Sequence, residues 1–231
     1  MKKHAFSLVE LSIVLIIIGL LIAGVSGGSK LIQNARLQHL ITETQEFKSN
    51  IATFYLTYSG YPGDFKEAYD FFGSVNSCTD VDVNTNAAGC NGDGDKIIEW
   101  SRESYRSYQH LESAELIKGN FNGTSTRYYS SYKKYEYHPP IECSTMGHTD
   151  MGTHCHQLGS TDNGNSPGFT PRELYRIDKK LDDSMPKTGH IRFRNFALYG
   201  VDDTTCGNTN GYHLDLAVGG CNFLYTIDVV N

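Results

Sequence analysis

Side-chain oxygens alternate with glycine in residues 91–95, whose sequence is Asn-Gly-Asp-Gly-Asp. A loop of this kind can wrap a hard cation, because Ca²⁺ prefers oxygen ligands and glycine lets the backbone turn tightly. The segment departs from the EF-hand pattern, since Lys96 and Arg102 stand where that pattern has a glycine and a late carboxylate. The alternative is a tight solvated turn held by Cys90. The ligands predicted for a structural Ca²⁺ ion are Asn91, Asp93, Asp95 and Glu99, with Glu103 as a second candidate for the late carboxylate.

A second group of metal-binding residue types lies between residues 143 and 156. His148, His154 and His156, with Cys143 and Cys155, are residue types that ligate Zn²⁺ or Cu²⁺. Their spacing matches no compact zinc motif. Cysteines in an oxidising compartment form disulfides, so we expect a disulfide here and three histidines left at the surface.

Aromatic and basic residues are interleaved in residues 127–135, whose sequence is Arg-Tyr-Tyr-Ser-Ser-Tyr-Lys-Lys-Tyr. Such a segment can bind single-stranded nucleic acid, because rings stack on bases while Lys133 and Lys134 hold phosphates. An exposed antiparallel strand has the same composition, with tyrosine and lysine as ordinary edge residues. We expect the strand, and nucleic acid stays an open partner.

The remaining motifs indicate no enzyme. We find no nucleophile with a base and an orienting group, no phosphate-binding loop and no paired acids in an apolar context. The net charge of −6 predicts no bulk attraction to nucleic acid or to anionic lipid.

The N-terminal region predicts one long helix in two parts. Residues 6–25 are apolar and long enough to cross the hydrocarbon core of a membrane. Gly24, Gly27 and Gly28 are expected to loosen the chain where it leaves the membrane. In residues 26–58 apolar side chains recur at three- and four-residue steps, which predicts an amphipathic continuation that packs on a sheet. Residues 60–63, Gly-Tyr-Pro-Gly, end the helix.

Residues 59–231 predict a globular head of mixed helices and strands, in an α+β order. Two Asp/Thr-x-x-Glu patterns, starting at Asp64 and Thr170, read as capping boxes that open helices. The expected helices are 64–72, 101–118 and 170–181, the expected strands are 128–137, 191–199, 213–218 and 224–230, and residues 143–168 are expected to be loop.

The cysteines fall into neighbouring pairs along the chain. Each pair would close a polar loop that has no core-forming residues of its own, and an even number of cysteines in an exported chain favours disulfides. Six cysteines allow fifteen connectivities, and of these the pattern favours Cys78 with Cys90, Cys143 with Cys155, and Cys206 with Cys221.

A carboxylate stands near the start of the apolar helix. Residues 1–5 form a short basic leader, and Phe6, Ser7, Leu8, Val9 and Glu10 follow it. A charge at the centre of a membrane span costs about 2.5–3.5 kcal/mol on insertion scales, and less near an end, so Glu10 calls for a partner. This N-terminus resembles the class III signal of type IV pilins and type II secretion pseudopilins.

The resemblance implies processing and assembly. A prepilin peptidase would cut between Ala5 and Phe6 and methylate the amine of Phe6, although that family usually has glycine where this chain has Ala5. Glu10 would then pair with the N-terminal amine of a neighbouring subunit and set the register of helices in a filament. Such an amine is largely cationic near neutrality.

Two other interpretations of the N-terminus stay open. One is an ordinary secretory signal peptide cut near residues 23–26, whose small residues suit a cleavage site. Glu10 and the helix that continues beyond this point argue against it. The other is a plain signal anchor with no role in assembly.

The sequence therefore predicts a leader (1–5), a transmembrane and assembly helix (6–25), its amphipathic continuation (26–58) and a periplasmic pilin-like head (59–231). The expected fold is α+β, with the long helix packed on a C-terminal antiparallel sheet and disulfide-closed loops. The resemblance implies a structural filament subunit, anchored in the bacterial inner membrane before assembly, whose partners are other pilin subunits and prepilin peptidase. The alternative is a minor tip subunit whose head binds a surface, a secreted protein or DNA.

Overall fold

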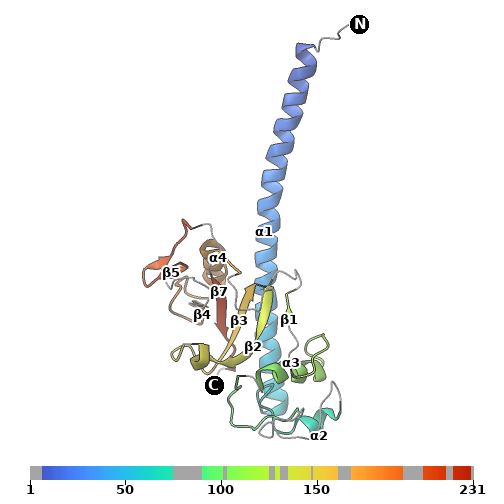
Figure 1. The fold of residues 1–231 in the computed structure, drawn as a ribbon, viewed down its shortest axis with the longest axis vertical. Coiled ribbons are helices and arrows are strands. Elements are labelled where there is room, and N and C mark those ends of the chain that lie inside the picture. Colours follow the sequence, from blue (N-terminus) through green and yellow to red (C-terminus); the bar gives the residue numbers. More distant parts are fainter. Residues whose placement is uncertain are drawn as a thin grey trace. The chain divides into compact units, whose positions relative to one another are not determined.

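The computed structural model describes residues 7–74, 90–100, 103–124, 128–130, 135–146, 148–160, 168–194, 205–216 and 221–229 (Figure 1). The chain divides into two compact units, residues 1–40 and residues 41–231. Helix α1, Leu8–Tyr58, runs through both of them.

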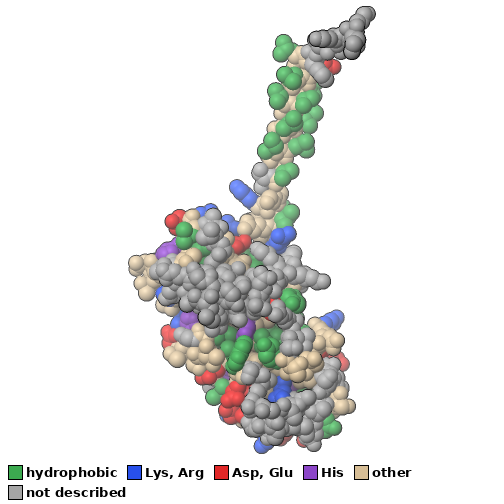
Figure 2. Space-filling model, in the orientation of Figure 1, with side chains coloured by type: hydrophobic (Ala, Val, Ile, Leu, Met, Phe, Trp, Pro, Cys, Tyr) green, Lys and Arg blue, Asp and Glu red, His purple; other side chains and the backbone are tan. Residues whose placement is uncertain are grey.

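The N-terminal part of α1 is apolar on all sides. Its leucine, isoleucine and valine side chains between Leu8 and Val25 are exposed, and Figure 2 shows hydrophobic side chains around this part of the helix. The helix is long and apolar enough to cross a membrane. The expected loosening at Gly24, Gly27 and Gly28 is wrong, because all three residues lie within α1. A glycine costs only about 1 kcal/mol relative to alanine in a helix, which continuous helix on either side outweighs.

The part of α1 that belongs to the second unit carries a buried stripe. Its members recur at three- and four-residue steps, as the sequence predicts. The ring of Phe47 lies against side chains of the neighbouring helix and strands, and its centroid is 4.0 Å from that of His156. The buried residues of the stripe are Ile41, Thr44, Phe47, Ile51 and Phe54.

The second unit contains an antiparallel sheet whose strand order is β1-β2-β3-β7-β4 (Figure 1). The register between β2 and β3 shifts between His138 and Ile141, where two prolines interrupt the ladder because proline has no N–H to donate. A two-stranded sheet pairs β5 with β6. The strands are β1 (Tyr128–Tyr129), β2 (Tyr135–Glu142), β3 (His154–Ser160), β4 (Ile191–Arg194), β5 (Gly207–Asn208), β6 (Gly211–Tyr212) and β7 (Asn222–Thr226).

Among the described residues, three further α-helices accompany the sheet, and a 3-10 helix covers Cys143–Met146. Helix α4, Pro171–Leu181, begins with the predicted capping box, in which Thr170 and Glu173 satisfy each other's backbone N–H groups. Helix α3, Glu103–Ser113, is shorter than expected. Helix α2, Ala68–Phe72, has Glu67 at its N-cap with no side-chain cap bond, so the capping box predicted at Asp64 is wrong.

The strand predictions are confirmed only in part. The strand expected over 128–137 is divided between β1 and β2, and β2 continues to Glu142. The strand expected over 213–218 is wrong for its described residues, which form a turn after β6. Strand β7 begins two residues before the expected start, whereas residues 195–199 of the expected 191–199 strand lie outside the described part.

The expectation of a loop over residues 143–168 is wrong, because this segment contains β3, which pairs with both β2 and β7. The expectation that its histidines lie at the surface is wrong for two of them, since His154 and His156 are completely buried. Strand pairing on both sides brings these rings into the interior. The remaining histidine of this group, His148, is partly exposed.

The ring of His156 is held between two tyrosines. The Tyr108 hydroxyl donates to the carbonyl of Tyr137 (3.1 Å), so its oxygen accepts from His156 Nε2 (2.9 Å), and the Tyr225 hydroxyl donates to Nδ1 (2.6 Å). Burial holds the pKa of His156 well below its usual value, with a smaller contribution from nearby His138. The ring is therefore neutral and carries its proton on Nε2.

Two predicted disulfides are present, Cys143–Cys155 and Cys206–Cys221. Cys90 is also disulfide-bonded, and Cys78 lies outside the described residues. The Cys143–Cys155 bond lies in a buried cluster with Met146, Met151 and Leu224. It therefore anchors the turn before β3 to the sheet.

Candidate functional site

Glu10 lies in the first turn of α1 and folds back toward the start of the helix. Its Oε2 accepts a hydrogen bond from the backbone N–H of Ser7 (2.9 Å), while Ser7 Oγ accepts from the N–H of Val9 (3.3 Å). Ser7 and Glu10 thus satisfy N–H groups that a helix N-terminus leaves without partners. The Ser-x-x-Glu pattern could have predicted this cap from the sequence.

This geometry places a carboxylate at the positive end of the helix dipole. Glu10 is exposed, as are its apolar neighbours in the helix. Of the residues predicted for processing, Ala5 and Phe6 lie outside the described part of the chain.

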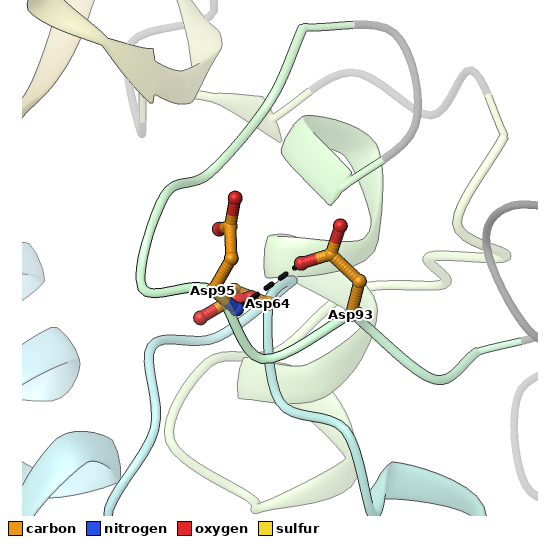
Figure 3. A group of neighbouring side chains, drawn as sticks. All are labelled: Asp64, Asp93 and Asp95. Atoms are coloured by element: carbon orange, nitrogen blue, oxygen red, sulfur yellow. Dashed lines mark hydrogen bonds between the residues drawn. The ribbon is translucent and has the colours of Figure 1, made fainter.

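The predicted metal loop brings three carboxylates together, but not the predicted set. Asp93 and Asp95 lie near Asp64, and one oxygen of each lies within 4.8 Å of those of the others. Figure 3 shows the three side chains and the bond that Asp93 Oδ1 accepts from the N–H of Asp95 (3.1 Å). Asn91 instead accepts from the N–H of Tyr69 (2.8 Å). Asp64 therefore replaces Asn91 in the group.

Asp64 holds the loop by accepting backbone hydrogen bonds. Its two oxygens accept from the N–H groups of Gly94 (2.8 Å) and Lys96 (3.0 Å). The loop passes so close that a Cβ on Gly92 would overlap the backbone of Asp64, so only glycine fits there. Burial raises the pKa of Asp64 to about 6, although these two hydrogen bonds act to lower it. The charges of Asp95 and Asp93 add to the rise.

Glu103, at the start of α3, binds the other side of the same loop. Its oxygens accept from the N–H groups of Asp93 (3.0 Å) and Glu99 (3.1 Å). Burial raises the pKa of Glu103 to about 8, and the nearby charges of Asp64 and Asp93 contribute. The Glu99 side chain is exposed and is not among the grouped carboxylates.

A buried histidine joins this loop to the chain after α1. His110 accepts from the N–H of Gly63 at Nδ1 (2.8 Å), and its Nε2 lies 2.7 Å from the carbonyl oxygen of Cys90, to which it donates. Burial lowers the pKa of His110 to about 4, so the ring is neutral at neutral pH. The acidic loop is thus held by side chains from two other segments.

We expect Ca²⁺ to stabilise this loop, with Asp64, Asp93 and Asp95 as ligands. The raised pKa values of Asp64 and Glu103 mean that the folded chain holds these protons more tightly than the unfolded chain does. The stability that the bound protons contribute is therefore lost as pH rises through about 6 for Asp64 and about 8 for Glu103. Ca²⁺ would relieve the repulsion in place of the protons. At a tenfold excess over Kd it adds about 1.4 kcal/mol, a rise in Tm of roughly 3–6 °C.

The measurement is Tm in millimolar CaCl₂ and in EDTA, at pH 6 and at pH 8. The difference between CaCl₂ and EDTA should be larger at pH 8 and should shrink in Asp95→Asn, while the exposed Asp215→Asn serves as the control. Equal Tm values in CaCl₂ and EDTA at pH 8 would contradict the Ca²⁺ site.

The other candidate ligands do not form a metal centre among the described residues. His154 accepts from the N–H of Ile98 at Nε2 (3.2 Å) and donates from Nδ1 to Asp228 (3.0 Å). Both ring nitrogens of His156 bind tyrosines, as described above, and the two nearby cysteines form a disulfide.

The tyrosines of the predicted nucleic-acid platform have different environments. The ring of Tyr135 is buried and stacks on Phe169 with centroids 4.4 Å apart, and the ring of Tyr128 lies 6.2 Å from Phe47. Tyr129 is exposed. Lys133 and Lys134 lie outside the described residues. Rings that belong to the core are not available to stack on bases.

Comparison with known proteins confirms the N-terminal resemblance. Residues 1–26 match the family described as the prokaryotic N-terminal methylation motif, which is the type IV prepilin-type signal. The match covers the N-terminal 26 residues, and it fits membrane anchoring through the apolar part of α1. No curated protein and no solved structure matches the chain.

Proposed function

We propose that this chain is a filament subunit of a bacterial type IV pilus or type II secretion pseudopilus. In this proposal prepilin peptidase cleaves between Ala5 and Phe6 and methylates the new amine. The observation that carries the proposal is the methylation motif in residues 1–26, continuous with a helix whose apolar N-terminal side chains are all exposed. A cleaved signal peptide has no need to continue into the helix that also packs on the sheet of the head.

Assembly would replace lipid contacts of α1 by contacts with neighbouring helices. This exchange changes the free energy of the apolar side chains little, because lipid tails are as apolar as leucine. The axial register of neighbouring helices therefore needs a polar determinant. Glu10 supplies it by pairing with the Phe6 amine of a neighbouring subunit. The cap that Glu10 forms with Ser7 holds the carboxylate at the end of the helix where that amine arrives.

Before assembly the chain would span the inner membrane once, with its head in the periplasm. The lysines of the leader support this orientation, because positively charged segments stay on the cytoplasmic side. The disulfides support it as well, since disulfides persist in oxidising compartments. The structural role would therefore be exercised in the envelope or outside the cell.

The alternative is a minor subunit at the filament tip, whose head binds a surface, a secreted protein or DNA. A cleft in the head, lined by Lys48, Tyr55 and Tyr61 among others, favours a binding role and is compatible with the same assembly through α1.

The test is to shear filaments from cells and to quantify this chain in the sheared and envelope fractions. Abundance in the sheared fraction supports a pilus subunit, and cleaved chain retained in the envelope supports a pseudopilus or a scarce initiating subunit. Recovery of the whole head as a soluble protein cut near residues 23–26 would contradict assembly through α1.

A further inference from the structure

A cleft of about 690 Å³ opens in the second unit, apart from the acidic loop's carboxylates. Its wall comes from α1 and from the segment that leads into β3. The end of β7 with the residues after it, and the turn before β4, complete the wall. This volume is in the range of small-molecule sites, about 300–1,000 Å³. The side chains at its rim are basic and those at its floor are aromatic.

The aromatic floor is built from packed rings. The centroids of Tyr55 and Tyr61 lie 4.8 Å apart, and those of Tyr61 and His154 lie 4.2 Å apart. Tyr61 and His154 are buried, whereas Tyr55 is partly exposed. The floor therefore offers ring faces to the apolar part of a ligand.

The carboxylate in the lining, Asp228, is already engaged. Its oxygens accept from the N–H of Thr153 (2.8 Å), the N–H of His154 (2.9 Å) and His154 Nδ1 (3.0 Å). Although burial acts in the opposite direction, these bonds hold the pKa of Asp228 below its usual value. The close approach depends on Gly152, at φ +137°, because a Cβ there would overlap Asp228. Asp228 thus serves to fix His154.

The lysines of the cleft have no such partner. Lys48 and Lys96 both line it, and among the residues that the structure describes neither forms an ion pair or a side-chain hydrogen bond. Lys48 is attracted by Asp182 and Asp228, yet desolvation dominates and lowers its pKa. Both lysine side chains are exposed, so an anion can reach their ammonium groups from solvent. His190 completes the basic rim.

We propose that this cleft binds a carboxylate attached to an aromatic or apolar group, supplied by a small molecule or by the C-terminus of a peptide. The lysine ammonium groups at the rim hold the carboxylate, and the Tyr55 and Tyr61 rings hold the apolar part. Asp228 and the nearby Asp182 offset part of the charge of the two lysines, which suits a monoanion better than a dianion such as phosphate. The proposal does not depend on filament assembly.

Met151 lines the cleft and Met185 does not, which gives a local readout. The full chain in an uncharged detergent, labelled with ¹³C at the methionine methyl groups, would be titrated with N-acetylphenylalanine and with its neutral amide. The acid should shift the Met151 signal to saturation and leave the Met185 signal unchanged. Because a hydrogen bond to a charged group is worth about 1.5–3 kcal/mol, the amide should bind at least about tenfold more weakly.

Variants then locate the binding. Lys48→Gln and Lys96→Gln should each weaken the binding of the acid about tenfold, and Lys66→Gln, at an exposed lysine outside the cleft, should leave it unchanged. A peptide that ends in Gly-Gly-Phe identifies the source: tighter binding than N-acetylphenylalanine assigns a peptide C-terminus, and equal binding assigns a small acid. Absence of a saturable Met151 shift with either probe, or equal affinity for acid and amide, would overturn the proposal.

Discussion

Glu10→Ala is expected to insert into the membrane normally and to be absent from filaments. Insertion does not need the carboxylate, since removal of a charge from an apolar helix makes insertion easier. Assembly needs it, because an amine buried among apolar helices without a counter-charge is strongly disfavoured. The measurement is the ratio of the chain in the sheared fraction to that in the membrane fraction, which should fall to background.

Two further variants separate charge pairing from helix capping. Glu10→Gln keeps an oxygen that can accept from the Ser7 N–H but loses the charge, so it should fail to assemble as Glu10→Ala does. Ser7→Ala loses the hydroxyl of the cap and keeps the charge. It should destabilise the helix start by about 0.5–2 kcal/mol and still assemble. Normal assembly of Glu10→Gln would show that Glu10 acts only as a cap, and the pairing account would be wrong.

Phe47→Ala is expected to destabilise the head by about 3–5 kcal/mol, a large share of the total stability of a typical domain. The ring is almost completely buried and stacks on His156. Its removal leaves a cavity between α1 and the sheet, and it opens the neutral His156 to water. Because the opened His156 can gain a proton in the folded variant whereas the buried ring of the wild type cannot, the difference in stability between the two should become smaller below about pH 6.5.

The measurement is the urea midpoint of the full chain in uncharged detergent, followed by near-ultraviolet circular dichroism. Glu46→Ala is the matched control, since Glu46 precedes Phe47 in the same helix and is exposed, so its effect should stay within about 0.5 kcal/mol. A midpoint for Phe47→Ala equal to that of Glu46→Ala would mean that α1 does not stabilise the head through this contact.

Local patterns predicted those features whose partners are close in sequence. The capping box of Thr170 and Glu173 is confirmed because both partners lie within one helical turn. The stripe of α1 is confirmed because its period comes from the helix itself. Asp64 has the same pattern as Thr170, but its carboxylate binds N–H groups of a loop about 30 residues later in the chain. Nothing in the local sequence distinguishes the two.

The central strand was missed for a related reason. Residues 154–160, His-Cys-His-Gln-Leu-Gly-Ser, contain no β-branched residue and no regular alternation of apolar and polar side chains. They form β3 because strands pair on both sides and because His156 finds tyrosine partners from other elements. Conversely, residues 213–216 alternate without forming a strand, since the described part has no pairing there beyond β6.

The candidate sites follow the same rule, since a site could be predicted only as far as its residues are close together in sequence. The N-terminal motif depends on adjacent residues and was recognised from the sequence alone. The acidic loop was located, but one of its carboxylates comes from Asp64, which is distant in sequence. The cleft with Lys48 and Lys96 could not be predicted, because its residues are scattered from α1 to the end of β7.

The mass of the N-terminal peptide recovered from sheared filaments tests the central claim most directly. The account predicts a chain that begins at Phe6 and carries one methyl group on its amine, and an unprocessed chain in cells that lack prepilin peptidase. A chain that begins at Met1 or within residues 23–26, or a chain absent from both the filaments and the processed envelope pool, would contradict it.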